Sequence, residues 1–330
     1  MAKKILVIRF SSIGDIVLTT PVLRGVKLQI GAEVHVLTKK AFAPIVEINP
    51  HVTKVYTLTE DINDVIGDLK KENYDEVIDL HHNLRSQRIK LALGKPATAF
   101  RKLNIEKWLM VQFKINRLPP IHIVDRYLET VSHLGVKPDG LGLDFFLRKE
   151  DNVNIEGKFG FKPFGYATMV IGAAHQTKCM TAEQIQQLCN ALDMPVILLG
   201  GKEEIEKANR ILSGINNDKV KSAVGELTIL QSASVIEQSG PIITHDTGMM
   251  HIAAALKKPQ VVVWGNTIPG FGMYPYYGNE NIKWLSFEQT DLHCRPCSKL
   301  GYDKCPKGHF KCMLEHDISA IASTAKSLIT

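Results

Sequence analysis

The order of apolar and polar stretches along the chain predicts alternating strands and helices. Short apolar runs rich in β-branched residues are typical of buried strands, and stretches with apolar residues at helical spacing separate them. In the first half we expect strands at Lys4–Phe10, Glu33–Leu37, Lys54–Leu58 and Glu76–Leu80, a turn at Ser11–Asp15, and helices at Asp61–Lys71 and from Thr19 or Thr20 to Ile30. This order indicates a parallel sheet covered by helices on both faces.

The same alternation restarts after a polar stretch from Arg148 to Lys162, which is the best candidate for a linker. The expected strands there are Tyr166–Ile171, Pro195–Leu199, Lys219–Val224, Pro241–Thr244 and Gln260–Trp264, and the last helix is His316–Ile329. A chain of 330 residues suits two domains. We therefore predict an α/β protein with two Rossmann-like domains, residues 1–155 and 156–330, an interdomain cleft, and a final helix that crosses back to the first domain.

Composition and charge narrow the class of protein. Apolar residues make up 45% and charged residues 22% of the chain, which are globular values. The apolar stretch near Met1 is too short for a signal peptide and no run approaches the roughly 20 residues of a membrane span, so we expect a cytoplasmic protein. Net charge is +6, and ten Lys or Arg against two acidic residues lie between Arg85 and Arg126. This basic segment indicates an anionic partner such as phosphates, an anionic membrane surface or nucleic acid, or else a solvated basic face.

The loop after the first strand carries the first candidate for chemistry. It reads Ser11-Ser-Ile-Gly-Asp15, and the chain has neither a G-x-G-x-x-G nor a G-x-x-x-x-G-K-[ST] loop. This argues against a Rossmann oxidoreductase and a P-loop NTPase. Two interpretations fit Asp15: it caps a helix, or it is a general base aimed into the cleft.

A second group of polar loops follows strands of the second half. In Thr244-His-Asp-Thr-Gly-Met-Met-His251, Asp246 can cap a helix, while Thr247 and Gly248 would offer a hydroxyl and backbone N–H groups to an anion. His251 shares a helix face with Thr247 and lies one turn behind it. These residues predict a phosphate site, although a lone helical histidine is usually structural.

Two further loops extend that prediction. Lys178 follows the first strand of the second half, where a lysine suits phosphate contact or is simply solvated. Glu204 follows the next strand, where it would accept hydrogen bonds from a ribose or serve as an acidic residue in a first helical turn. Together the loops favour a diphosphate held by the second domain and a base supplied by the first.

Four cysteines cluster near the C-terminus. Cys294, Cys297, Cys305 and Cys312 lie within 19 residues, close to His293 and His309. Four thiolates make a structural zinc site in many proteins, but this cluster has a single C-x2-C pair and irregular spacing. We therefore expect packed thiols and no bound metal.

These motifs together make the chain recognisable. Arg9-Phe-Ser-Ser-Ile-Gly-Asp15, Lys178, Asp246-Thr-Gly-x-x-His251 and Gly265-x-Thr267 resemble the bacterial ADP-heptose:lipopolysaccharide heptosyltransferases, glycosyltransferase family 9. The resemblance covers essentially the whole length. It departs from the family where Cys-Met-Thr follows Lys178 and where Asn266 precedes Thr267.

The resemblance implies a GT-B fold and an inverting transfer of heptose from ADP-heptose to a hydroxyl of a lipopolysaccharide inner-core sugar. It implies no cofactor and no obligatory metal. By motif position Asp15 is the base, and Lys178, Thr247 and Gly248 bind the diphosphate. We also expect Glu204, Asp246 and His251 at the donor.

The same resemblance suggests which partners to expect. They are a nucleotide-sugar donor and an anionic lipopolysaccharide core acceptor, with peripheral contact at the inner membrane surface and no nucleic acid. Two alternatives stay open: a GT-B transferase for another nucleotide sugar, and a basic nucleic-acid-binding protein with the cysteines as a zinc module. Few aromatics interrupt the basic segment and no RNA- or DNA-binding motif is recognisable, which disfavours the second.

Overall fold

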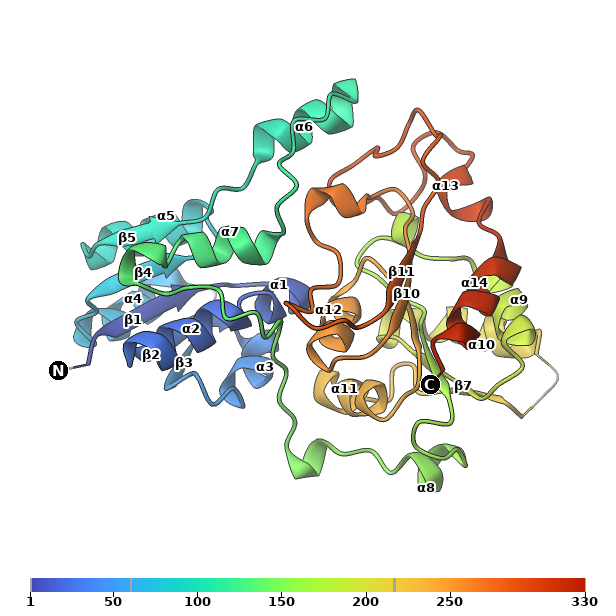
Figure 1. Ribbon diagram of the computed structural model, residues 1–330. Coiled ribbons are helices and arrows are strands. Elements are labelled where there is room, and N and C mark those ends of the chain that lie inside the picture. The colour runs from blue at the N-terminus through green and yellow to red at the C-terminus, as the bar shows by residue number, and fades with distance from the viewer. Residues whose placement is uncertain (1, 60, 216–217, 330) are drawn as a thin grey trace. The chain divides into compact units, whose positions relative to one another are not determined.

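The computed structural model describes residues 2–59, 61–215 and 218–329 and divides the chain into two compact units (Figure 1). The first unit is Met1–Lys102, Ile121–Phe146 and Tyr276–Glu280; the second is Leu103–Pro120, Leu147–Pro275 and Asn281–Thr330. Each unit is therefore built from several separate stretches of chain. The predicted domain boundary between residues 155 and 156 stays a prediction.

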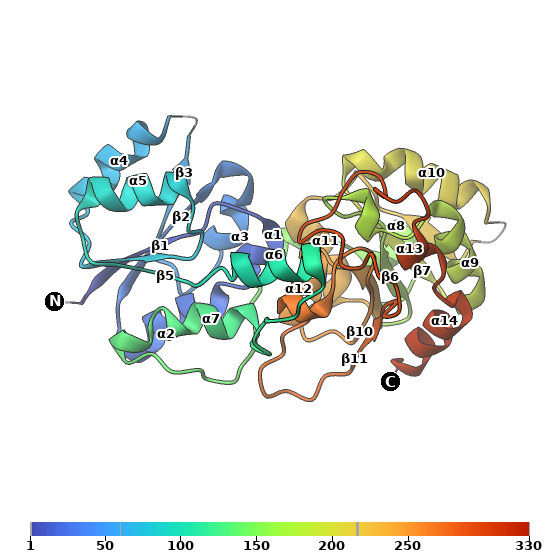
Figure 2. The ribbon, with the colours of Figure 1, turned by 90° about the horizontal axis from the view of Figure 1, so that it is seen from above.

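The first unit is a five-stranded parallel sheet in the order β3-β2-β1-β4-β5. Its strands are β1 (Lys4–Ile8), β2 (Glu33–Lys39), β3 (Lys54–Leu58), β4 (Glu76–Asp79) and β5 (Ala97–Ala99). Its helices are α1 (Ile13–Val17), α2 (Thr20–Ile30), α3 (Ala43–Glu47), α4 (Ile62–Lys71), α5 (Leu84–Leu93) and α7 (Ile123–Glu129). In Figure 2, α4 and α5 cover one face and α2 and α7 the other. The central strand β1 is accordingly apolar on both faces, and Ile5 to Ile8 are fully buried.

The second unit holds a six-stranded parallel sheet in the order β11-β10-β9-β6-β7-β8. The strands are β6 (Ala167–Val170), β7 (Val196–Leu199), β8 (Val220–Ser222), β9 (Ile242–His245), β10 (Gln260–Val263) and β11 (Trp284–Phe287). The helices are α6 (Asn104–Phe113), α8 (Ile155–Phe159), α9 (Ala182–Leu192), α10 (Ile205–Ser213), α11 (Ile229–Glu237), α12 (Gly248–Ala255), α13 (Lys311–Leu314) and α14 (Ile318–Ser327). Figure 1 shows α11 and α12 on one face and α9, α10 and α14 on the other.

Two predictions about local structure are wrong. The final helix does not cross back: α14 packs on α9, because Ile321, Ala322 and Ala325 form an apolar face that joins the core of the second unit. The stretch Ser11–Asp15 is not only a turn, since Ser12 caps α1 and the helix begins at Ile13. In contrast, α2 begins at Thr20 with a proline in its first turn, as predicted.

The membrane prediction rests on helix length. Among the residues that the structure describes, no helix is both long enough and apolar enough to cross a bilayer.

Candidate active site

Both sheets reverse their strand order between two neighbouring strands. The reversal lies between β1 and β4 in the first unit and between β6 and β9 in the second. In open parallel sheets, ligands bind beyond the carboxyl ends of the strands at such a reversal. The sequence-predicted residues sit there: Asp15 follows β1, Lys178 follows β6 and Asp246 follows β9.

Asp15 is held by the residues just before it. Its Oδ2 lies 2.6 Å from Nη2 of Arg9 and accepts hydrogen bonds from the backbone N–H and the hydroxyl of Ser12 at 3.2 and 3.0 Å. Arg9 is itself fixed, because it donates to Leu80 O, Ser11 O and the Tyr127 hydroxyl. The contacts that Asp15 makes with Arg9 and Ser12 all use its Oδ2 atom, and within the described part of the chain none uses Oδ1. Oδ1 is therefore the carboxylate oxygen that these contacts leave unused.

These contacts keep Asp15 ionised. Burial alone would raise the pKa of this carboxyl, but the charge of Arg9 and the hydrogen bonds from Ser12 outweigh it, so the pKa is lowered. The expectation that Asp15 is itself a helix N-cap is wrong: Ser12 is the N-cap, and Asp15 stands in the first turn and bonds back to it.

An open pocket of about 340 Å³ adjoins the Asp15 loop in the first unit. Its lining comes from the carboxyl ends of β1 and β2, from the loop after β4 and from the start of α5: Phe10, Ser11, Lys39, His81, Asn83, Leu84 and Arg85. Burial and the nearby Arg9 lower the pKa of His81 to about 4, so this ring is neutral at pH 7. The positive charge of the pocket therefore comes from Lys39 and Arg85. The sequence had pointed to Ser11 and Arg85 but not to Lys39 or His81, because these strand ends meet only in the folded sheet.

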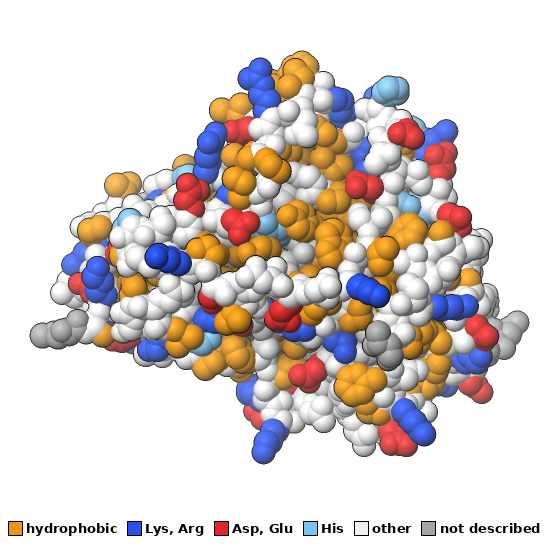
Figure 3. All heavy atoms as spheres, in the orientation of Figure 1, with side chains coloured by type: hydrophobic (Ala, Val, Ile, Leu, Met, Phe, Trp, Pro, Cys, Tyr) orange, Lys and Arg blue, Asp and Glu red, His pale blue; other side chains and the backbone are white. Residues whose placement is uncertain are grey.

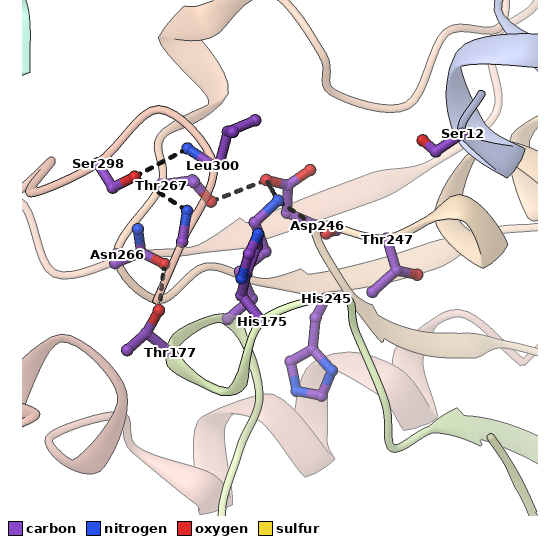
Figure 4. A network of polar contacts seen from close by, with 12 residues as sticks. Ser12, His175, Thr177, His245, Asp246, Thr247, Asn266, Thr267, Ser298 and Leu300 are labelled. Carbon is purple, nitrogen blue, oxygen red and sulfur yellow. Dashed lines mark hydrogen bonds and ion pairs between the residues drawn. The ribbon is translucent and has the colours of Figure 1, made fainter. Parts of the chain in front are cut away.

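In the second unit the two sides of the strand reversal are joined by an ion pair. Lys178 Nζ lies 2.7 Å from Asp246 Oδ2, and both side chains are 14% exposed. The Thr267 hydroxyl, which follows β10, donates to the same oxygen at 2.8 Å (Figure 4). Asp246 therefore holds Lys178 in place, and the predicted pair of residues is brought together.

A second set of contacts holds the loop that carries Lys178 against the loop after β10. Thr177 accepts a hydrogen bond from the Tyr302 N–H at 2.8 Å. Its hydroxyl donates to Asn266 Oδ1 at 3.0 Å (Figure 4). The buried Arg295 donates to the carbonyls of Gly265 and Thr267, each at 2.7 Å. Sequence reasoning missed Thr177 and Arg295, since these partners are 28 or more residues away in the chain.

The residues at which the chain departs from the family motif make hydrogen bonds within the second unit. Where Cys-Met-Thr follows Lys178, the Met180 N–H donates to Nε2 of His245 at 3.0 Å. Burial lowers the pKa of His245 to about 3, which keeps that nitrogen available as an acceptor. Asn266, the residue before Thr267 at the second departure, is the partner of Thr177.

The start of α12 differs in detail from the prediction. Thr247, and not Asp246, is the N-cap: its hydroxyl accepts from the Met249 N–H at 3.2 Å, because Asp246 is engaged with Lys178. Gly248 is the first helical residue. His251 is buried, with 2% of its surface exposed.

Glu204 stands beside the loop that carries Lys178. Its Oε2 accepts a hydrogen bond from the Gly201 N–H at 2.7 Å. This is the arrangement expected if Glu204 is simply an acidic residue in the first turn of a helix. The same carboxyl group also lies against Gly172, because a Cβ on that glycine would come within 2.5 Å of it. The structure therefore brings Glu204 to the edge of the predicted donor site.

The four clustered cysteines are all free thiols. Cys294 Sγ lies 3.7 Å from His309 Nε2, and burial raises the pKa of Cys312 to about 12. The described residues contain no group of three or more His, Cys, Asp or Glu arranged to hold a metal ion. The absence of a bound metal stays a prediction.

Two heptosyltransferases are similar to this chain over most of its length. Lipopolysaccharide heptosyltransferase 1 of Pseudomonas aeruginosa is 24% identical over 318 residues, which cover 90% of this chain and 86% of that protein. Lipopolysaccharide heptosyltransferase 1 of Campylobacter coli is 25% identical over 296 residues, covering 80% and 84%.

Solved structures share the fold. A glycosyl transferase family 9 protein from Veillonella parvula superimposes with a TM-score of 0.79 at 20% identity, covering 99% of this chain and 97% of that one. ADP-heptose lps heptosyltransferase II of E. coli gives 0.76 at 18%, covering 99% and 98%. The two parallel-sheet units are thus those of a GT-B protein, as predicted. The pattern described as glycosyltransferase family 9 (heptosyltransferase) matches residues 62–302. The chain therefore belongs to glycosyltransferase family 9 and is a glycosyltransferase of the heptosyltransferase type.

Proposed function

We propose that this protein transfers heptose from ADP-heptose to a hydroxyl of a lipopolysaccharide inner-core sugar, with inversion at the anomeric carbon and without a metal ion. One observation carries the proposal: the strand reversal of one sheet presents a fixed, ionised Asp15, and that of the other presents Lys178 paired with Asp246. The first arrangement suits a base and the second suits a diphosphate.

The second unit would bind the donor. The Lys178 ammonium, the Thr247 hydroxyl and the amide groups at the start of α12 meet the negative charge that grows on the departing diphosphate. Asp246 acts as a positioning residue, because its carboxylate fixes the ammonium at 2.7 Å. Two structures of similar fold, E. coli heptosyltransferase WaaC with ADP and with ADP-2-deoxy-2-fluoro heptose, favour an ADP-linked sugar; both are 19% identical.

The first unit would bind the acceptor. Oδ1 of Asp15 accepts the proton of the acceptor hydroxyl. The hydroxyl oxygen attacks the anomeric carbon on the face opposite the diphosphate, which leaves. A single displacement of this kind inverts the configuration at that carbon. Lys39 and Arg85 line the neighbouring pocket and would hold a carboxylate or phosphate of the acceptor. Ammonium and amide groups supply the positive charge at the leaving group, so the transfer needs no metal ion.

The donor is tested with a nucleotide panel. We expect ADP to raise the melting temperature more than UDP, GDP or CDP, since a ligand stabilises according to its saturation. Transfer from ADP-heptose should persist in EDTA, and NMR of the product should find the opposite anomeric configuration. Equal stabilisation by UDP would favour another nucleotide sugar, and loss of turnover in EDTA would contradict the metal-free reaction.

The acceptor pocket is tested by charge reversal. Lys39→Glu and Arg85→Glu should raise the acceptor KM and leave the donor KM unchanged, and the effect should weaken in high salt. Lys40→Glu is the matched control, because this neighbour is exposed but does not line the pocket. An unchanged acceptor KM at low salt in the two pocket variants would show that Lys39 and Arg85 do not bind the acceptor.

A further inference from the structure

Helix α6 carries large apolar side chains but buries none of its own residues. Ile105 is 72% exposed, Trp108 52% and Phe113 58%. The rings of Trp108 and Phe113 contact each other at 5.2 Å in an edge-to-face arrangement. In Figure 3, hydrophobic side chains gather at the top of the view, over α6. Packing within the described chain therefore does not account for these side chains.

Basic residues surround this apolar surface. Between residues 101 and 117 the chain has one acidic residue, Glu106, and five basic ones: Arg101, Lys102, Lys107, Lys114 and Arg117. This short segment thus carries four more positive than negative charges. A solvated basic face would explain the charges but not the exposed tryptophan and phenylalanine among them.

The helix is anchored to the second unit rather than loosely attached. Lys107 Nζ lies 5.7 Å from the centre of the Phe271 ring. Lys114 Nζ donates to the carbonyls of Cys294 and Pro296 at 3.3 and 2.7 Å. Both contacts fix α6 at its basic residues and leave the three apolar side chains outward.

We propose that α6 lies in the headgroup region of an anionic lipid bilayer, with Ile105, Trp108 and Phe113 entering the acyl boundary. Helices that combine exposed Trp, Phe or Ile with Lys and Arg lie in the plane of a membrane interface. Tryptophan favours this depth, and basic residues near it are attracted by anionic lipids. A second copy of the chain is the poorer partner, because two such patches with an excess of four positive charges each would repel. The membrane contact does not rest on the proposed reaction.

The experiment is sedimentation of the full chain with phosphatidylglycerol–phosphatidylcholine vesicles, with phosphatidylcholine alone as the neutral comparison. We expect binding to the anionic vesicles that weakens with salt. The triple variant Ile105→Ser, Trp108→Ser, Phe113→Ser should bind at least 100-fold more weakly, at roughly tenfold for each large apolar side chain. Arg117→Glu should weaken binding by about fivefold or more.

A matched control removes three exposed leucines of the first unit. Leu28, Leu91 and Leu141 are 65%, 82% and 55% exposed, so their triple change to serine deletes similar surface elsewhere. This control should sediment like the unchanged protein. The α6 triple variant should also keep its turnover on a water-soluble, deacylated acceptor, which separates failure of this proposal from failure of the proposed reaction.

Tryptophan emission gives an independent readout. Of the three tryptophans, Trp264 is buried, Trp284 is half-buried and stacked on the Tyr274 ring, and Trp108 is exposed. Anionic vesicles should therefore shift the emission to the blue in the unchanged protein and not in Trp108→Phe. Equal sedimentation of the α6 triple variant and the unchanged protein would overturn the proposal. So would a dimer in solution that becomes monomeric in this variant, because the patch would then join two copies.

Discussion

Asp15 stays ionised because of Arg9 and Ser12, which precede it in the chain. Replacing Asp15 therefore tests whether this charged carboxylate takes part in the reaction. Asp15→Asn keeps the size of the side chain but replaces the carboxylate, the proposed base, by a neutral amide. We expect turnover to fall by roughly 10²–10⁴-fold, the usual contribution of a general base. The Kd for ADP should not change, because Asp15 belongs to the first unit and the loops proposed to bind the donor belong to the second. Near-normal turnover of the purified variant would show that this carboxylate serves only the first turn of α1.

A pH profile tests the pairing with Arg9. The folded-state pKa of Asp15 is lowered, so the pair stabilises the fold above the ordinary carboxyl range and loses this contribution as the pH falls through the lowered value. The acid limb of kcat/KM should therefore lie below the usual pKa of an aspartate, about 3.9. In Arg9→Gln, burial acts without the opposing charge, and the limb should move to higher pH.

The buried Arg9 calls for a milder second variant. Ser12→Ala deletes only the hydroxyl that donates to Asp15 at 3.0 Å, so it should move the acid limb in the same direction but by less. Melting temperatures of both variants show whether the fold is kept. A limb that stays in place in both would mean that Asp15 does not govern the pH dependence.

Among elements, the loops after β6 and β10 approach each other so closely that only glycine fits. A Cβ on Gly265 would lie 2.2 Å from the carbonyl oxygen of Thr177, which is backbone and cannot rotate away. Gly265→Ala should cost roughly 1–3 kcal/mol of overpacking strain. Where the strain falls on the donor loops, the ADP Kd should rise about ten- to a hundredfold, as measured by calorimetry.

Gly270→Ala is the matched control for that change. It adds the same methyl group five residues later, where the nearest atom is a side-chain carbon of Ile268 at 3.5 Å. Both the ADP Kd and the melting temperature should stay close to those of the unchanged protein. Unaltered ADP binding in Gly265→Ala would mean that the Thr177 loop is not part of the donor site.

The same elements show what sequence could and could not predict. The pattern located β1 to β4 and β6 to β10 within two residues. Most of these strands are buried on both faces, which gives near-continuous apolar runs. It missed β5 and β11, which are edge strands of three and four residues without such runs. Lys178 and Asp246 were predicted as separate loops, but their ion pair, the hold of Arg9 on Asp15 and the pocket with Lys39 depend on which strands become neighbours.

For the whole molecule, the alternation of chain segments between units predicts how fragments behave. Fragments 1–155 and 156–330 would each lack part of a unit: the first would miss Tyr276–Glu280, and the second would miss Leu103–Pro120 with α6. We expect each fragment alone to bind nucleotide and acceptor poorly and to unfold without a sharp transition in calorimetry. A cooperative transition and full ADP affinity in 156–330 would instead support the predicted boundary.

The short stretch Tyr276–Glu280 also bears on how the protein is made. The Tyr276 hydroxyl donates to Asp125 at 2.9 Å, and the Asn279 N–H donates to the Gly140 carbonyl at 2.7 Å. A Cβ on Gly278 would meet that carbonyl at 2.1 Å, so the stretch lies tightly on its unit. On the ribosome, the amino-terminal sheet must therefore wait until more than four-fifths of the polypeptide has emerged before its last segment arrives. A premature stop anywhere before this stretch leaves both halves of the enzyme unfinished, not just the later one.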